Sequence, residues 1–526
     1  MQSTFEEYVT TATAAGSVPA DDGLEAVEAA SMDGPASVFQ GYDSFMSAIR
    51  SAAVTGTTSS TGASSAMTYT ICTTMEEISN ALSISASVSA SCGFGSVDAK
   101  SEFVSKLKVT RTSVHLVAYA KAVTQGTQFD SVSLKITAPD DARTFFRIYG
   151  DSFVSAIERG GEYAAVFSFQ SRTTDEQTDV LTTLNVNGIS TQGTIEASLQ
   201  VNLQNAFRNI ETTKSLTQFV RGSTAKAPDA DDIVQFALDF PSKVSATDLV
   251  TLSYATSSYV RVPDFPPPLI DDFLTIQDNV ALFVGTPDEP GLSVLFAKAN
   301  SLAASVTELE DLYQFYAYRG DTKLTEHKKL LLSDIQTLKT MFKQMEKDPT
   351  KEYTNPDLNS SGWTPPVLNY TLGTTSLSGG GGDHFFSDVS ADHVRQKTRI
   401  AEIVGWGGNV IDSITTTYSR GGIMHRMDRR GGDGGDNQST LTLQPNQRIT
   451  SIQTRFGNVV NWISFKGADF EVTCPADPQG CDGQGYWTEP ADECTRLLGF
   501  SGSFGNVLDH LEAVTVRFSP ATFGPA

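Results

Sequence analysis

The sequence lacks several features that would assign it to a common class of protein. Its 526 residues include no run of about 20 apolar residues, so we expect no helix that spans a bilayer. The N-terminus has no basic start followed by an apolar block, and we therefore expect no signal peptide. The 5 cysteines are an odd, low number that suggests no disulfide framework, although Cys474, Cys481 and Cys494 cluster and could form one bridge.

Positive charge and catalytic motifs are also scarce. The 38 Lys and Arg residues are outnumbered by 61 Asp and Glu residues, which gives a formal net charge of −23. Nucleic acids and anionic lipids are bound through clustered Lys and Arg, so we expect no nucleic-acid partner and no general attraction to membranes. The sequence has no HExxH, GxSxG or GxxxxGK[ST] motif, and its 6 histidines are scattered. We therefore expect no enzyme activity, no metal site and no cofactor.

The composition changes along the chain and predicts a multidomain protein. Residues 1–66 are rich in Ser, Thr, Ala and Gly and are interpreted as a flexible extension. Residues 67–350 contain blocks of strand-like and helix-like patterning, which favours an α+β domain. Residues 351–378 have the composition of a linker, and residues 379–526 consist of short alternating segments separated by glycine-rich turns, which is typical of an all-β domain.

The last domain contains a repeated motif. It reads GNVID at 408–412, GNVVN at 457–461 and GNVLD at 505–509, at nearly even intervals. Such a period predicts three similar units around a pseudo-threefold axis. A glycine followed four residues later by Asp presents backbone N–H donors and a carboxylate acceptor, which suits the vicinal hydroxyls of a sugar. The alternative is that each Asp only caps its own turn.

Glycine-rich turns at SGGGGDHFF and RRGGDGGDN accompany this motif, and together with pieces such as IAEIVGWGGNVIDSITTTY they resemble the jacalin-related lectins. The resemblance covers residues 379–519 and implies a β-prism of three Greek-key sheets. It implies one sugar site made of Gly505, Asn506, Val507 and Asp509 beside Gly382, and a second made of Gly408, Asn409, Val410 and Asp412 beside Gly435. The middle repeat departs from the pattern because Asn461 replaces the Asp. Mannose-type glycans are the expected ligands.

Two segments of the α+β region alternate between apolar and polar residues. They are LSISASVSASCGF at 82–94 and IEASLQVNLQ at 195–204. Each is long enough for a transmembrane β-strand, which needs about 9–11 residues. Such strands cross a bilayer only within a closed barrel. The alternatives are ordinary half-buried strands or amphipathic helices, since the residues from 195 to 207 also have helical spacing.

Between these segments, FFRIYGDSFVSAIERGGEYAAVFSF at 145–169 resembles the signature of the membrane-attack-complex/perforin (MACPF) superfamily. Tyr149, Gly150 and Phe153 match, and Gly160 with Gly161 matches the glycine pair, whereas the Asp151-Ser152 pair departs from the pattern. The resemblance implies a bent antiparallel sheet with two flanking helical clusters, about 74–108 and 174–210, that convert to β-hairpins. The residues expected to face lipid are Leu82, Ile84, Val88, Phe94, Ile195, Leu199, Val201 and Leu203.

Together these features predict a lectin-targeted pore-forming protein. The lectin domain would bind cell-surface glycans, and a homo-oligomeric ring would insert two hairpins from each subunit into the lipid membrane. The alternative is a carbohydrate-binding adhesion or defence protein whose MACPF-like domain makes no pores. Without a signal peptide, we expect a soluble monomer that is cytoplasmic or released by an unconventional route before it reaches its target membrane.

Overall fold

The structure is a computed structural model. It describes residues 36–84, 103–104, 106–107, 109, 112–137, 141–171, 174–210, 212–285, 289–377, 380–474, 481–492 and 494–523. Val88 and Phe94, which were predicted to face lipid, lie outside these residues, as does most of the alternating segment to which they belong.

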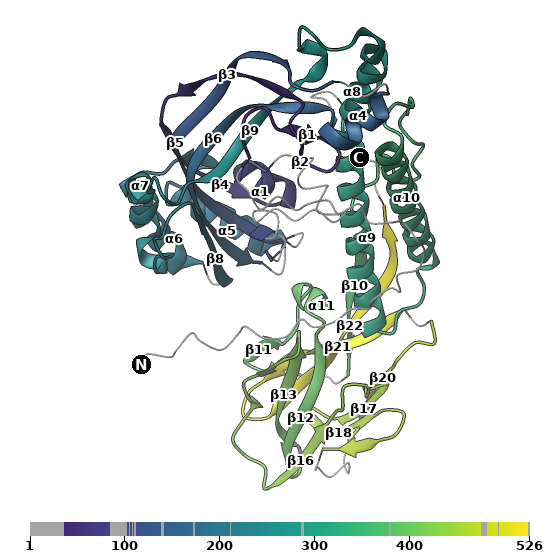
Figure 1. The fold of residues 1–526 in the computed structure, drawn as a ribbon. Helices are drawn as coiled ribbons and strands as arrows, with labels where there is room; N and C mark the ends of the chain where they lie inside the picture. Colours follow the sequence, from purple (N-terminus) through teal and green to yellow (C-terminus); the bar gives the residue numbers. More distant parts are fainter. Residues whose placement is uncertain are drawn as a thin grey trace. The chain divides into compact units, whose positions relative to one another are not determined.

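An antiparallel sheet dominates the N-terminal region (Figure 1). Its strands are β1 Gly41–Asp43, β2 Ala48–Arg50, β3 Val54–Thr61, β4 Ser64–Cys72, β5 Val114–Leu134, β6 Ser152–Gln170, β7 Gln192–Thr194, β8 Thr213–Arg221 and β9 Val250–Ser258. The long strands β5 and β6 pair with each other at its centre. The interpretation of residues 1–66 as a flexible extension was wrong for residues 41–66, because Ser- and Thr-rich β3 and β4 form ladders with β5. Small polar residues suit a strand when the neighbouring strand supplies the backbone partners.

The outer partner strands of β5 and of β6 change at the same level of the sheet. Along β5, the partner is β4 up to Val123 and β3 from Gly126 onward. Along β6, the partner is β9 up to Gly160 and β8 from Glu162 onward. Register shifts interrupt the ladders of β5 and β6 here, and such bulges bend strands locally. We call the region formed by residues 122–126 and 158–162 the sheet junction.

Helices cover both faces of the sheet on the β4 and β8 side of the junction. The helices are α1 Met75–Ala81, α5 Thr174–Val186, α6 Ala197–Asn209, η1 Ala230–Asp232 and α7 Ile233–Lys243. Ile78 of α1 shares a buried cluster with Ala164 and Val166 of β6, whereas α5, α6 and α7 share another with Tyr163 and Ala165. Because neighbouring strand residues point to opposite faces, the two helical segments cover opposite sides of the sheet.

Residues 197–209 are therefore helical in this structure, which favours the helical alternative over a strand. Helix α1 begins with a capping box, in which the Thr74 hydroxyl accepts from the Glu77 backbone N–H and the Glu77 carboxylate accepts from the Thr74 backbone N–H. The remaining helices of this region are α4 Ala142–Tyr149, η2 Tyr259–Arg261, η3 Pro267–Leu269, α8 Ile270–Val284, α9 Leu292–Phe315 and α10 Thr322–Lys347.

The C-terminal region forms three further antiparallel sheets within the described residues. The first contains β10 Val367–Ser376, β11 His384–Ser387, β21 Thr495–Phe504 and β22 Leu508–Thr522; the second contains β12 Arg399–Gly407, β13 Ile411–Arg420, β14 Ile423–Arg426, β15 Arg430–Gly431 and β16 Asn437–Thr442; the third contains β17 Ser451–Phe456, β18 Val460–Lys466, β19 Glu471–Thr473 and β20 Gly483–Thr488. Helix α11 Asp392–Arg395 follows β11. The predicted linker at 351–378 was too long, because β10 pairs with β22 along its length.

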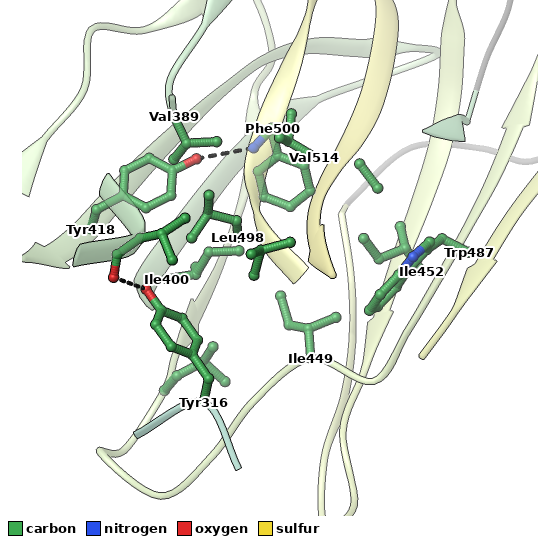
Figure 2. Packing of buried hydrophobic residues seen from close by; sticks show 14 of the residues in the cluster. Tyr316, Val389, Ile400, Tyr418, Ile449, Ile452, Trp487, Leu498, Phe500 and Val514 are labelled. Carbon is green, nitrogen blue, oxygen red and sulfur yellow. Dashed lines mark hydrogen bonds between the residues drawn. The ribbon is translucent and has the colours of Figure 1, made fainter. Parts of the chain in front are cut away.

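One buried cluster joins the three sheets (Figure 2). The fully buried Tyr418 hydroxyl accepts a hydrogen bond from the Phe500 backbone N–H at 3.2 Å, which connects two sheets. Tyr316, which follows α9, belongs to the same cluster, and its hydroxyl donates to the carbonyl oxygens of Val394 and Thr398 at 3.0 and 3.2 Å. The interior that positions the GNV loops is therefore continuous with the end of α9.

Candidate carbohydrate site

The three GNV motifs form the same turn. Each lies between the two central strands of its sheet: β12 and β13, β17 and β18, and β21 and β22. In each turn the glycine N–H donates to the carbonyl oxygen two residues ahead, at 3.0 Å from Gly408, 3.2 Å from Gly457 and 3.1 Å from Gly505. Beside each turn the register shifts by one residue, and the residue without a pairing partner is in the second strand: Asp412, Asn461 and Asp509. The sequence repeat is thus a repeat of backbone conformation.

The fifth residue of the motif folds back onto its own turn. The side-chain oxygen of Asn461 accepts from the Gly457 N–H at 2.8 Å, and the carboxylate of Asp509 accepts from the Gly505 N–H. Both side chains therefore cap their own turns. This does not exclude sugar binding, because a carboxylate can accept about four hydrogen bonds and the turn uses only part of that capacity.

The structure brings each predicted glycine close to its predicted Asp. A Cβ atom added to Gly382 would lie 2.6 Å from Asp509 Oδ2, and the Gly382 N–H donates to Ser503 Oγ at 3.1 Å. A Cβ atom on Gly435 would lie 3.1 Å from Asp412 Oδ2, and its φ of +92° is one that glycine adopts readily. Each carboxylate is therefore flanked by backbone that carries no side chain, which leaves room for a ligand.

The electrostatics of the Asp509 site favour neutral ligands that donate hydrogen bonds. Burial raises the pKa of Asp509, the nearby carboxylate of Asp383 raises it further, and the hydrogen bond from Gly505 opposes both. Two neighbouring carboxylates would repel an anion, but they accept hydroxyl protons well. A sugar without acidic groups fits this chemistry.

The third loop differs from the other two in two places. Asn461 replaces the Asp, as the sequence indicates. The structure adds a second difference: Gly382-Asp383 precedes β11 and Gly435-Asp436 precedes β16, whereas Cys481-Asp482 precedes β20. A thiol side chain thus stands in the position of the site glycine. The unequal length of the preceding loops hid this correspondence in the sequence.

Arg429 is a supporting residue that sequence reasoning missed. Its guanidinium lies 4.4 Å from the centre of the Trp406 ring, and it donates to the Gly434 carbonyl oxygen at 2.8 Å and to Ser413 Oγ at 2.5 Å. Arg429 therefore holds the loop before Gly435 against the hairpin that carries Asp412. Its position before the RGGDGG run was the available signal.

The signature residues of the N-terminal region lie at two places in the sheet. Gly150 ends α4 with a φ of +79°, and the following Asp151 is buried and accepts from the backbone N–H and hydroxyl of Ser44 at 2.7 and 2.8 Å. Burial raises the pKa of Asp151 to about 6. Tyr149 is the last residue of α4, and Phe153 is buried near the start of β6. Gly160 and Gly161 lie in the sheet junction.

The residues predicted to face lipid are mostly buried against the sheet. Helix α6 packs against the sheet through Leu199, Leu203 and the preceding Ile195. The residues after α1 pack against the opposite face through Leu82 and Ile84. Val201 differs, because this residue is 57% exposed. Among the described residues, no helix is both long and apolar enough to cross a bilayer.

The comparison with protein families identifies the C-terminal region. The model of the jacalin-like lectin domain matches residues 375–514. This part of the chain is a jacalin-like lectin domain. Such a domain implies carbohydrate binding, and its limits enclose all three GNV loops and both predicted sites.

Solved structures similar to this chain include three plant lectins. A mannose-binding jacalin-related lectin from Ananas comosus is 21% identical, with 27% of this chain and 96% of that chain covered and a TM-score of 0.24. A Malaysian banana lectin is 18% identical, with 29% and 99% covered and a TM-score of 0.23. A mannose-specific jacalin-related lectin from Morus nigra, solved with mannose, is 19% identical, with 32% and 99% covered and a TM-score of 0.23. No curated protein matches the chain.

Proposed function

We propose that this chain is a lectin-targeted pore-forming protein. The lectin domain binds mannose-type glycans on a cell surface, copies of the chain assemble into a ring, and each copy inserts two β-hairpins, residues 74–108 and 174–210, into the membrane. The observation that carries this proposal is the topology of the N-terminal sheet. Each of the two helical segments connects a pair of neighbouring antiparallel strands, β4 with β5 and β6 with β8.

The two helical segments leave the sheet at the same end. Cys72, the last residue of β4, lies opposite His115 of β5, which lies opposite Ser168 of β6, which lies opposite Ser215 of β8. If both segments became extended, the three ladders between these four strands would continue in their present register, with no change in the order of the four strands. The connections, residues 73–113 and 171–212, are nearly equal in length. Each is long enough for two strands of about 10 residues, which a bilayer requires.

The edge of the sheet explains why insertion should depend on assembly. Strand β7 pairs with the outer side of β4, with Tyr69 opposite Gly193. Strand β7 belongs to the second segment, so extending this segment would uncover the edge of β4. An uncovered edge inside a membrane is unfavourable unless a neighbour pairs with it. The edge strand β8 of a second copy is a suitable neighbour, and a ring would satisfy every edge.

The lectin domain supplies the targeting that the acidic chain lacks. The mannose-type ligand is supported by the mannose-binding lectins among the similar structures and by the neutral, acceptor-rich site at Asp509. Individual sugar sites bind weakly, but a ring that presents many of them binds with avidity. Glycan binding and assembly would therefore support each other.

A second function, carbohydrate binding without pore formation, is favoured by one observation. Asp151 departs from the MACPF signature and holds the turn at Ser44 through two hydrogen bonds. If this contact keeps the start of β6 fixed, the chain acts as a lectin only. Both functions predict glycan binding, and only the first predicts leakage.

Val201→Lys tests the pore. Val201 is exposed on α6, so the substitution should change the free energy of unfolding by less than about 1 kcal/mol. In an extended strand Val201 shares the lipid face with Leu199 and Leu203, where a lysine costs about 2–4 kcal/mol in each subunit. We expect dye release from phosphatidylcholine vesicles carrying a mannosylated lipid to fall at least about tenfold, with vesicle binding unchanged.

Ser198→Lys is the matched control. Ser198 is also exposed on α6, but in an extended strand it faces water, so we expect dye release close to that of the unaltered chain. Equal leakage from both lysine variants would show that Val201 does not enter the lipid. Vesicle binding by the unaltered chain without leakage at any concentration would favour the lectin-only function.

The sugar sites are tested by Asp412→Ala and Asp509→Ala. Each substitution removes a charged acceptor, and we expect each affected site to lose about tenfold or more in affinity for mannose. The double variant should lose nearly all binding in calorimetric titration. Asn461→Ala is the control, because we expect no sugar at the third loop. Normal binding by the double variant would contradict the site assignment.

A further inference from the structure

A buried ionic group lies beside the glycine pair of the sheet junction. Glu162 directly follows Gly161 and has no exposed surface. Its Oε1 atom lies 2.5 Å from Arg221 Nη2, at the end of β8, and its Oε2 atom accepts from the Tyr119 hydroxyl of β5 at 2.7 Å. Three adjacent strands are thus joined through one carboxylate.

Arg221 extends this group to the other half of the sheet. Its Nη2 atom also donates to the carbonyl oxygen of Thr251 in β9 at 3.1 Å. Strands β8 and β9 occupy successive stretches of the same side of β6, and they meet at the junction. The guanidinium is therefore a polar connection between the two halves of the sheet, and the Lys121 ammonium, which bonds Glu158 and Ser253, is another.

The backbone beside this group contains three glycines. Gly160, Gly161 and Gly222 pack against one another, and a Cβ atom on Gly222 would overlap the Gly160 carbonyl oxygen. Glycine backbone changes conformation more readily than that of other residues, although the side chains of Leu252 and Val244 lie close to Gly160 and Gly161. The force that keeps the junction in one geometry must come from its neighbours.

A buried ion pair fixes the geometry of its two partners but adds little net stability to the fold. Desolvation offsets most of its attraction, so its net stabilisation is small, but removing one partner leaves a buried charge without compensation. If the junction opens, water replaces each partner and the pair separates at little cost. The neighbouring Lys121–Glu158 pair differs, because the Glu158 side chain is 43% exposed and water already screens it.

The buried ionic group also lies beneath the first helical segment. The Tyr119 ring belongs to the buried cluster that contains Ile78 of α1 and the following Leu82. Removing α1 from the sheet would uncover Tyr119 and admit water to Glu162. Release of the first segment and opening of the junction would thereby be coupled.

We propose that Glu162, Arg221 and Tyr119 form a latch that holds the sheet junction closed in the unassembled chain and opens when the first helical segment leaves the sheet. The latch rests on the proposed pore function for its purpose, but its existence can be tested without membranes. Its signature is local: loosening should affect the junction and leave the lectin domain unchanged.

The test is amide hydrogen exchange of the full-length chain in solution. In Arg221→Gln, the unpaired Glu162 carboxylate should speed exchange in peptides covering residues 157–164 and 219–223 about a hundredfold. In Glu162→Gln, which keeps the shape and an acceptor for Tyr119, the increase should be about tenfold. The double variant should exchange more slowly than Arg221→Gln, because it leaves no buried charge unpaired.

Glu158→Gln is the matched control, since it removes a carboxylate of the same strand from a half-exposed pair, and it should speed exchange less than Glu162→Gln does. Equal exchange in Glu162→Gln and Glu158→Gln would overturn the latch. Leakage is then measured separately: Glu162→Gln should release vesicle dye at a severalfold lower protein concentration. Fast junction exchange with no leakage from any variant, including the unaltered chain, would refute the pore while leaving the latch in place.

Discussion

The two β-rich regions of this chain use glycine in opposite ways. In the lectin domain, glycines border the side chains that are expected to meet a ligand, as Gly382 borders Asp509. In the N-terminal sheet, Gly160 and Gly222 border each other's backbone at a place where two ladders change partners. In the lectin domain, the glycines leave space beside a side chain. In the N-terminal sheet, the glycines lie where the backbone itself is proposed to change conformation.

The difference follows from how each region closes its core. In the lectin domain, three similar central hairpins carry the GNV turns, and the three turns share one hydrogen-bond pattern. A repeated unit that packs against copies of itself has little freedom to change alone. In the N-terminal sheet, the long strands β5 and β6 pass through the junction while their outer partners end there. The regular, repeated hairpins therefore belong to the proposed binding region, and the irregular strand pairing belongs to the region that is proposed to move.

Gly160→Ala and Gly408→Ala should separate the two uses most strongly. A Cβ atom at Gly160 would overlap the carbonyl oxygen of Ala122, whereas no heavy atom lies within 4 Å of a Cβ atom at Gly408. We expect Gly160→Ala to lower the free energy of unfolding by about 3 kcal/mol or more and Gly408→Ala to change it by less than about 0.5 kcal/mol. Urea denaturation checks both values. Equal effects would show that the junction is no more tightly packed than the turn.

Acid should weaken the N-terminal sheet through His115. This fully buried side chain bonds Ser113 and Ser168 at 2.9 Å, and burial lowers its pKa to about 4. Since an unfolded histidine has a pKa of about 6.5, the unfolded chain binds an extra proton between these values. The contribution of His115 to the free energy of unfolding should therefore fall as the pH falls, by about 2 kcal/mol from pH 7 to pH 5. The raised pKa of buried Asp151 acts in the opposite direction over this range.

The measurement is urea denaturation at both pH values, followed by hydrogen exchange in β5. His115→Gln should remove the destabilisation that His115 causes, because glutamine does not titrate, so the variant should lose less stability between pH 7 and pH 5 than the unaltered chain. His384→Gln, which changes an exposed histidine of the lectin domain, should leave the pH dependence intact. The same pH dependence in all three proteins would assign the effect to other groups.

The sequence predicted the lectin domain better than the N-terminal region, for a physical reason. Three copies of the GNV motif each require the same turn, so local chemistry alone indicates the repeat and its site residues. The strands β3 and β4 carry no comparable signal, because VTGTTSST and SSAMTYTIC become strands only through pairing with β5, which lies much later in the chain. The helix–strand ambiguity of residues 195–204 could not be settled locally either, since burial of Leu199 and Leu203 against the sheet favours the helix.

Contacts between residues far apart in sequence were also out of reach. In the sequence, nothing distinguishes Glu162 and Arg221 from other charged residues of strands. Only the register of β6 and β8 shows that they lie opposite each other. Cys481 could be matched to Gly382 only after the starts of β20 and β11 were known. Patterns identify residues that act through their own loops, whereas residues that act across strands require the fold.

Gly382→Ala and Gly381→Ala make the smallest and most local comparison. A Cβ atom at Gly382 would lie 2.6 Å from both Asp509 Oδ2 and the Phe504 nitrogen, whereas no heavy atom lies within 4 Å of a Cβ atom at Gly381. Because the added methyl group must displace the carboxylate that we propose accepts the sugar hydroxyls, Gly382→Ala should weaken mannose binding at this site about tenfold. Gly381→Ala should bind normally, and calorimetry in the Asp412→Ala background isolates the site. Equal affinities would mean that the sugar does not use the Asp509 carboxylate, and that the glycine beside it only closes a turn.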